Sequence, residues 1–139
     1  MWRTLVVALG IALAAGCSGS PPKPRTATQL TIQAQTGPAT APLRLSQATL
    51  RCDGTAVATG FLRNTPDRAC ALVHRGAIQQ VAINQRSRRV CSQIYGGLQR
   101  AHITGTIDAK PINLTVTRTD GCGTADWQTL EPLLGDPQR

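Results

Sequence analysis

Aromatic residues are scarce in this chain of 139 residues, which contains one Phe, one Tyr and two Trp. Aromatic side chains bury more area than most others, so a core built from this sequence has few large anchors. A domain of roughly 90 residues is already marginal on core burial alone. We therefore expect covalent cross-links to contribute to its stability.

The chain also lacks the short motifs that mark common catalytic sites. It contains no G-x-S-x-G, no H-E-x-x-H and no P-loop. Its few acidic residues are scattered and form no evident pair. His74 is expected late in a helix and His102 on the outer side of a strand, where histidines are usually structural. The sequence therefore predicts a protein that is not an enzyme and that needs no cofactor.

The N-terminal apolar run is too short to cross a bilayer, which takes roughly 20 residues. Residues 5–15, LVVALGIALAA, follow Arg3 and lead into Leu13-Ala14-Ala15-Gly16-Cys17. This pattern is typical of a signal peptide, and its end is similar to a bacterial lipobox, in which a diacylglycerol is attached to the cysteine. We expect a signal peptide over residues 1–16 and a lipid on Cys17. An ordinary signal peptide with a chance cysteine is the alternative.

The lipid assignment changes the cysteine count of an exported chain from odd to even. Of the 5 cysteines, Cys52, Cys70, Cys91 and Cys122 remain. Outside the cytoplasm such a set should form disulfides, and four cysteines allow three pairings between which spacing does not choose. A zinc site would need close pairs such as C-x2-C, which are missing. We expect no metal.

Charge of one sign dominates, with 15 Lys and Arg against 7 Asp and Glu. The densest basic cluster is Arg86, Arg88 and Arg89. Nucleic acid is a common partner of proteins with such an excess of basic residues. A lipoprotein on the outer face of the bacterial cytoplasmic membrane, however, rarely meets nucleic acid. We interpret the cluster as a solvated basic face, with attraction to an anionic membrane surface as the alternative.

Composition divides the remaining chain into a tether and a domain. Residues 18–42 are mostly Ser, Pro, Thr, Gly, Gln and Ala, so residues 17–42 are predicted to be a lipid-anchored flexible linker. The folded domain is predicted over residues 43–134, and residues 135–139 would form a C-terminal tail. Two disulfides would each stabilise this domain by about 3 kcal/mol in the chain-entropy model.

Two stretches of the domain have strand character. Residues 43–52 are predicted to form a strand, and the shift of the apolar positions from odd to even between Leu45 and Ala48 indicates a bulge or a break. Residues 101–119 form the clearest hairpin, because apolar and polar residues alternate on both sides of a turn at residues 108–110.

Helical signals lie between and after these strands. Thr65-Pro66-Asp67 combines a capping hydroxyl, a proline and an acid, as a helix start does. This helix should end before Gly76, and helical character resumes over residues 78–83. A short helix is predicted over residues 124–130, ended by Pro132. The predicted class is α+β, an antiparallel sheet with one or two helices on one face.

An ordered set of segments carries a resemblance to a known family. The segments are Thr49-Leu50-Arg51-Cys52, Pro66-Asp67-Arg68-Ala69-Cys70-Ala71-Leu72, Cys91-Ser92-Gln93-Ile94-Tyr95, the hairpin Gly105-x-Ile107-x-Ala109-Lys110-x-Ile112, and Cys122. Over about residues 45–123 the chain resembles the subtilisin inhibitor-like family of actinobacterial exported protease inhibitors. The resemblance implies disulfides Cys52–Cys70 and Cys91–Cys122, a five-stranded antiparallel sheet with two helices, and often a homodimer.

The resemblance also implies a reactive-site loop over residues 90–95, with Gln93–Ile94 as the scissile bond. Gln93 would then enter the specificity pocket of a subtilisin-like serine protease, and Val90 and Ile94 would line neighbouring apolar subsites. Cys91, Ser92 and Tyr95 would flank the bond, and Gly96-Gly97 would leave the far side of the loop soft. The alternative is a non-inhibitory cell-envelope lipoprotein that uses the same fold to bind a protein partner.

Overall fold

The computed structural model describes residues 27–139, so the predicted signal peptide and Cys17 lie outside the described residues. The strands are β1 (Gln29–Thr36), β2 (Arg44–Asp53), β3 (Thr55–Ala58), β4 (Arg100–Ile107) and β5 (Lys110–Thr117). The helices are α1 (Pro66–His74), α2 (Ala77–Arg86) and α3 (Gly121–Leu134), with a 3-10 turn η1 (Gly60–Leu62). Within residues 27–139, no helix combines the length and hydropathy needed to span a membrane.

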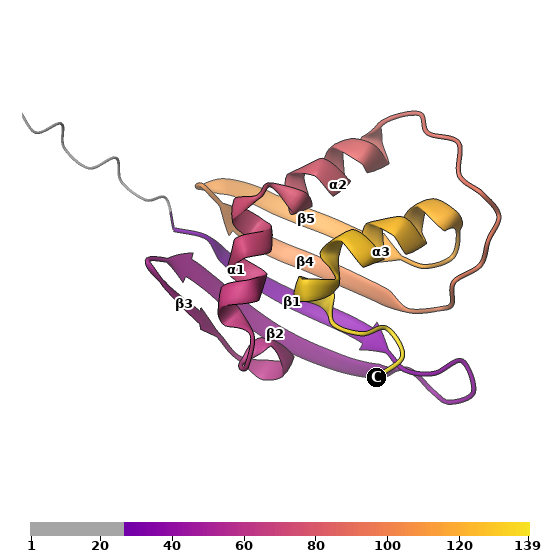
Figure 1. Ribbon diagram of the computed structural model, residues 1–139, viewed down its shortest axis with the longest axis horizontal. Helices are drawn as coiled ribbons and strands as arrows, with labels where there is room; N and C mark the ends of the chain where they lie inside the picture. The colour runs from indigo at the N-terminus through magenta and orange to yellow at the C-terminus, as the bar shows by residue number, and fades with distance from the viewer. Residues whose placement is uncertain (1–26) are drawn as a thin grey trace, which may run out of the picture.

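The five strands form one antiparallel sheet in the order β3-β2-β1-β4-β5. The α-helices cover one face of this sheet (Figure 1). The predicted α+β class is therefore confirmed, as are the disulfides Cys52–Cys70 and Cys91–Cys122. The described residues hold three α-helices where one or two were predicted.

The middle strand of the sheet comes from the segment predicted to be a linker. Residues 29–36, QLTIQAQT, pair with β2 on one side and β4 on the other. Leu30, Ile32 and Ala34 are buried, whereas Gln29, Gln33 and Gln35 on the other face are exposed. The predicted domain start at residue 43 is wrong, because the glutamines that suggested a linker lie on the outer side of a half-buried strand.

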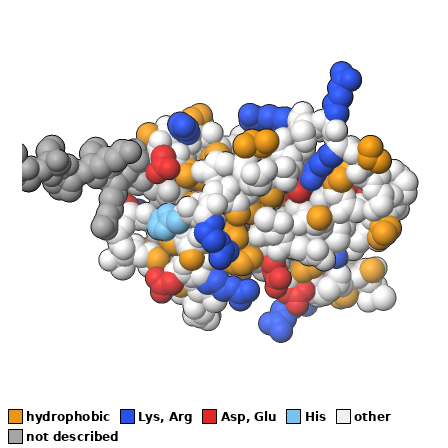
Figure 2. Space-filling model, turned by 45° about the horizontal axis from the view of Figure 1, so that its top comes forward, with side chains coloured by type: hydrophobic (Ala, Val, Ile, Leu, Met, Phe, Trp, Pro, Cys, Tyr) orange, Lys and Arg blue, Asp and Glu red, His pale blue; other side chains and the backbone are white. Residues whose placement is uncertain are grey.

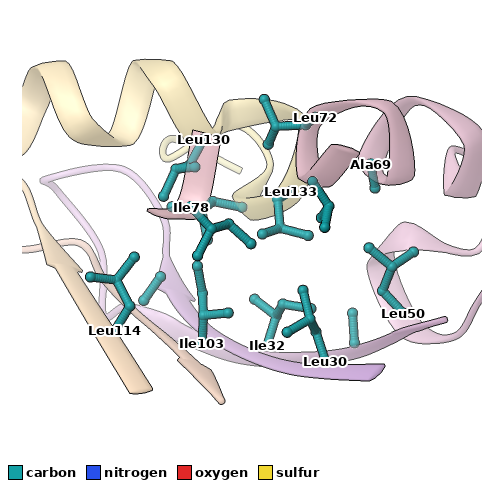
Figure 3. Packing of buried hydrophobic residues seen from close by; sticks show 14 of the residues in the cluster. Leu30, Ile32, Leu50, Ala69, Leu72, Ile78, Ile103, Leu114, Leu130 and Leu133 are labelled. Carbon is teal, nitrogen blue, oxygen red and sulfur yellow. The ribbon is translucent and has the colours of Figure 1, made fainter. Parts of the chain in front are cut away.

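The core lies between the inner face of the sheet and the three helices. Figure 3 shows side chains of the sheet directed toward those of the helices. The labelled residues are Leu30, Ile32, Leu50, Ala69, Leu72, Ile78, Ile103, Leu114, Leu130 and Leu133, all of them buried. Trp127 on α3 is the one large aromatic side chain in this core, and its indole N–H donates to the carbonyl oxygen of Gly135 at 3.2 Å.

Helix α3 is longer at both ends than the predicted helix 124–130. It begins at Gly121 because the carboxylate of Asp120 accepts a hydrogen bond from the N–H of Gly123 at 2.8 Å, an N-terminal cap. It continues past Pro132, which was expected to end it, because Leu133 and Leu134 gain full burial in the last turn. The C-terminal tail then meets the end of β1, where the N–H of Gly37 donates to the carbonyl oxygen of Pro137 at 2.9 Å.

The two predicted strand features have different outcomes. The bulge after Leu45 is absent, because residues 44–51 pair with β1 without interruption and Leu45 simply faces solvent. The hairpin of β4 and β5 is confirmed, with its turn at Asp108 and Ala109. Both residues have positive φ, 50° and 60°, as a two-residue type I′ turn requires.

Candidate functional site: the loop between α2 and β4

The segment between α2 and β4, residues 87–99, has no regular secondary structure and passes around the N-terminal end of α3 (Figure 1). Four of its apolar side chains are well exposed: Val90 at 101%, Ile94 at 68%, Tyr95 at 59% and Leu98 at 70%. Separate hydrophobic side chains project at this end of the molecule (Figure 2). These side chains are exposed to solvent, so the segment belongs to the surface of the molecule and not to its core.

The entry limb of the loop, residues 89–92, is attached to the first turns of α3 at three points. Cys91 is bonded to Cys122. The N–H of Gly121 donates to the carbonyl oxygen of Ser92 at 2.9 Å. A Cβ on residue 121 would lie 1.9 Å from the hydroxyl oxygen of Ser92, so a larger residue there would force that hydroxyl to turn away.

The third point is an ion pair between Arg89 and Asp126. The Nη1 and Nη2 atoms of Arg89 donate to the two carboxylate oxygens of Asp126, at 3.0 Å and 2.5 Å. The Asp126 side chain is 4% exposed. Its hydrogen bonds raise the pKa of the Arg89 guanidinium above the ordinary value, so this cation stays charged. The prediction that Arg89 belongs to a solvated basic face is therefore wrong, whereas Arg86 and Arg88 are exposed.

The exit limb, residues 96–99, is held as well. The N–H of Gly96 donates to the carbonyl oxygen of Arg118 at 2.8 Å. A Cβ on Gly96 would lie 2.4 Å from the hydroxyl oxygen of Thr124. The softness expected from Gly96-Gly97 is therefore not what the structure shows at Gly96, because its missing side chain permits close packing.

Gln99 completes this second attachment. It is 1% exposed, and its amide nitrogen donates to the carbonyl oxygen of Gly37 at 2.8 Å. Its amide oxygen accepts from the guanidinium of Arg118 at 3.1 Å. A buried polar side chain with both ends bonded fixes the chain where it enters β4.

Between the two limbs lie Gln93, Ile94 and Tyr95, all of them exposed. Within the described residues, no hydrogen bond joins these three to the rest of the protein. Their backbone N–H and C=O groups are thus open to pair with another polypeptide. The predicted loop residues, 90–95, thus lie in one irregular segment that is held at both ends and is exposed except at the half-buried Cys91.

Among the residues that the structure describes, His102 and the cysteines beside the loop are engaged in other interactions, and His74 is exposed at the end of α1. His102 Nε2 and the side-chain oxygen of Asn113 lie 2.8 Å apart on the outer side of the sheet. Cys91 and Cys122 lie near Asp120, but their sulfurs are joined in a disulfide and are not thiolate ligands.

Sequence reasoning missed the residues that hold the loop. Asp126, Gln99 and Gly121 are separated from residues 90–95 in the chain and carry no motif of their own. The one available signal is spacing: Arg89 and Cys91 are two residues apart, and Cys122 and Asp126 are four apart. Such a pair of spacings lets two side chains of an extended segment face two side chains of a helix.

No family model and no curated protein matches this chain. Among solved structures, it is similar to the crystal structure of Streptomyces caespitosus sermetstatin in complex with Bacillus licheniformis subtilisin. The two share 15% sequence identity at a TM-score of 0.49, over 79% of this chain and 99% of the other.

Proposed function

We propose that this protein is a serine protease inhibitor that presents residues 90–95 to a subtilisin-like protease in the manner of a substrate. The observation that carries the proposal is the state of Gln93, Ile94 and Tyr95, which are exposed and without internal hydrogen bonds between two fixed limbs. A protease binds an extended segment through its main chain and reads the side chains in pockets. Residues 93–95 offer both a main chain without internal hydrogen bonds and exposed side chains.

The proposed reactive bond is Gln93–Ile94. Gln93 would enter the specificity pocket, and Val90 and Ile94 would fill neighbouring apolar subsites. Because the limbs are ordered before binding, little conformational entropy would be lost on association. If the bond is cut, the held limbs keep the new amine beside the acyl-enzyme, so that religation competes with hydrolysis.

The test is an inhibition screen against three serine proteases: a subtilisin, a trypsin and a chymotrypsin. Intact mass is followed over several hours in each mixture. We expect tight inhibition of the subtilisin and a chain that stays largely uncut. A folded protein that inhibits none of the three would instead support the non-inhibitory envelope lipoprotein that binds a partner through this fold.

A lipid on Cys17 would hold the inhibitor on the outer face of the bacterial cytoplasmic membrane. The support is the sequence Leu13-Ala14-Ala15-Gly16-Cys17 at the end of the apolar run. The Cys17→Ser variant should lose the lipid mass and leave the membrane fraction. A wild-type product that is retained there without a lipid would contradict the anchor and leave the inhibitor proposal intact.

A further inference from the structure

The entry limb of the loop lies in register with α3 and runs in the opposite direction. Arg89 meets Asp126, Cys91 is bonded to Cys122, and Ser92 meets Gly121. As the loop residue number rises, the α3 partner number falls. The limb is therefore aligned along the helix and not merely attached to it at the disulfide.

The spacing of the two elements explains this alignment. Residues four apart on a helix lie on one face, about 6 Å apart along the axis. Residues two apart on an extended chain face the same way and lie about 6.6 Å apart. Cys122 and Asp126 thus match Cys91 and Arg89, and the alternation turns Val90 outward, where it is 101% exposed.

The disulfide and the adjacent Gly121–Ser92 hydrogen bond hold the limb at neighbouring residues, 91 and 92, and would leave its start free to pivot about them. A second contact two residues away removes that freedom. The two parallel N–H···O bonds of Arg89 to Asp126 also fix the orientation of the guanidinium. Gln85 supports the carboxylate from α2, since its amide nitrogen lies 3.4 Å from Asp126 Oδ2 and donates to the carbonyl oxygen of Thr115 at 3.1 Å.

We propose that Asp126 is a positioning residue, which with Arg89 keeps the residues before the Gln93–Ile94 bond extended and so determines whether the bound chain resists hydrolysis. This inference rests on the proposed inhibitor function. Asp126 itself lies under the loop at 4% exposure and does not reach the protease. Asp126 affects hydrolysis of the Gln93–Ile94 bond indirectly, because it fixes the orientation of the entry limb.

The experiment compares wild type with Asp126→Asn and with the double variant Arg89→Gln/Asp126→Asn. The double variant removes both charges, so it leaves no lone buried ion to unfold the protein. The control is Asp53→Asn, which breaks the exposed Arg51–Asp53 pair (2.9 Å) at the far end of β2. The probe protease is Bacillus licheniformis subtilisin, and intact mass measures hydrolysis after residue 93.

We expect hydrolysis of the 93–94 bond to rise at least about tenfold in both loop variants while the melting temperature stays within a few degrees. The Asp53→Asn control should match wild type. A folded double variant that is cut no faster than wild type would overturn the positioning role.

A second readout needs no protease. Exchange of the Gly121 amide hydrogen, which is bonded to Ser92, should become at least about tenfold faster in both loop variants, with the amides of β1 and β4 unchanged. Unchanged exchange at Gly121 would also overturn the inference. If Gly121 exchange rises but subtilisin binds neither wild type nor variants, the limb is positioned as described and the proposed function has failed.

Discussion

The two disulfides serve different parts of the molecule. Cys52–Cys70 joins a strand to a helix, and both cysteines are buried, at 8% and 5% exposure. Cys91–Cys122 joins an irregular segment to the start of a helix, and both cysteines are only half-buried. The first links elements that already pack through the core, whereas the second links a segment that has little packing of its own. One disulfide supports the fold and the other supports the loop.

The largest expected effect comes from removing the first disulfide. In the variant Cys52→Ala/Cys70→Ala, the free energy of unfolding should fall by about 3 kcal/mol, the chain-entropy value for a loop of this size. Denaturant unfolding measures the change. Inhibition of subtilisin by the folded protein should vary by less than about threefold. A large loss of inhibition with normal stability would reverse the roles assigned to the two bonds.

Removing the second disulfide should mainly damage the loop. In Cys91→Ala/Cys122→Ala, we expect the inhibition constant for subtilisin to rise at least about a hundredfold, or about 2.7 kcal/mol. The chain should then be cut after residue 93. The cost in stability should fall short of the chain-entropy value of about 4 kcal/mol, because the freed segment gains entropy in the folded state too. Unchanged inhibition would mean that the other contacts suffice to hold the loop.

A substitution at residue 93 sharpens the comparison because it alters recognition without touching either disulfide. Gln93 has no charge to pair with the carboxylate at the base of a trypsin pocket. Gln93→Lys should strengthen trypsin inhibition at least about tenfold, or roughly 1.4 kcal/mol.

The matched control for residue 93 is Gln128→Lys, an exposed position on α3. If Gln93→Lys is folded yet neither inhibits trypsin nor is cut after residue 93, the loop is not a protease-binding loop. Rapid cutting without inhibition would mean that the loop is displayed but too mobile, and the partner-binding alternative would then be favoured.

Several parts of the fold could be predicted from local pattern alone. The hairpin of β4 and β5 alternates cleanly around its turn, and the start of α1 carries a proline and an acid in its first turn. β1 could not be recognised in the same way, since its apolar residues are only three and its neighbours are polar. What makes this segment the central strand is pairing with β2 and β4, which lie later in the chain.

The exposure of the segment around residues 90–95 could be predicted, whereas the contacts that hold it could not, and its role as a protease-binding site stays a prediction. The exposed loop was placed by resemblance over the residues that the structure displays, with Cys91 as its anchor. Arg89 illustrates the limit, because its charge cluster indicated a solvated face while its partner, Asp126, comes from a helix far along the chain. Only tertiary structure brings those two charges together.

The smallest expected effect tests whether fold stability and loop rigidity are separate properties. Ala109 has a φ of 60°, a left-handed conformation that costs a residue with a Cβ roughly 1 kcal/mol and glycine little. Ala109→Gly should therefore raise the free energy of unfolding by about 0.5 kcal/mol after the added freedom of the unfolded chain is subtracted. Denaturant unfolding measures this gain.

Hydrolysis of the 93–94 bond by subtilisin should not change, because none of the contacts described above joins the turn between β4 and β5 to either limb of the loop. If hydrolysis slows in proportion to the added stability, then cutting occurs through global unfolding and not through opening of the loop. That result would contradict the assignment of one disulfide to the fold and the other to the loop.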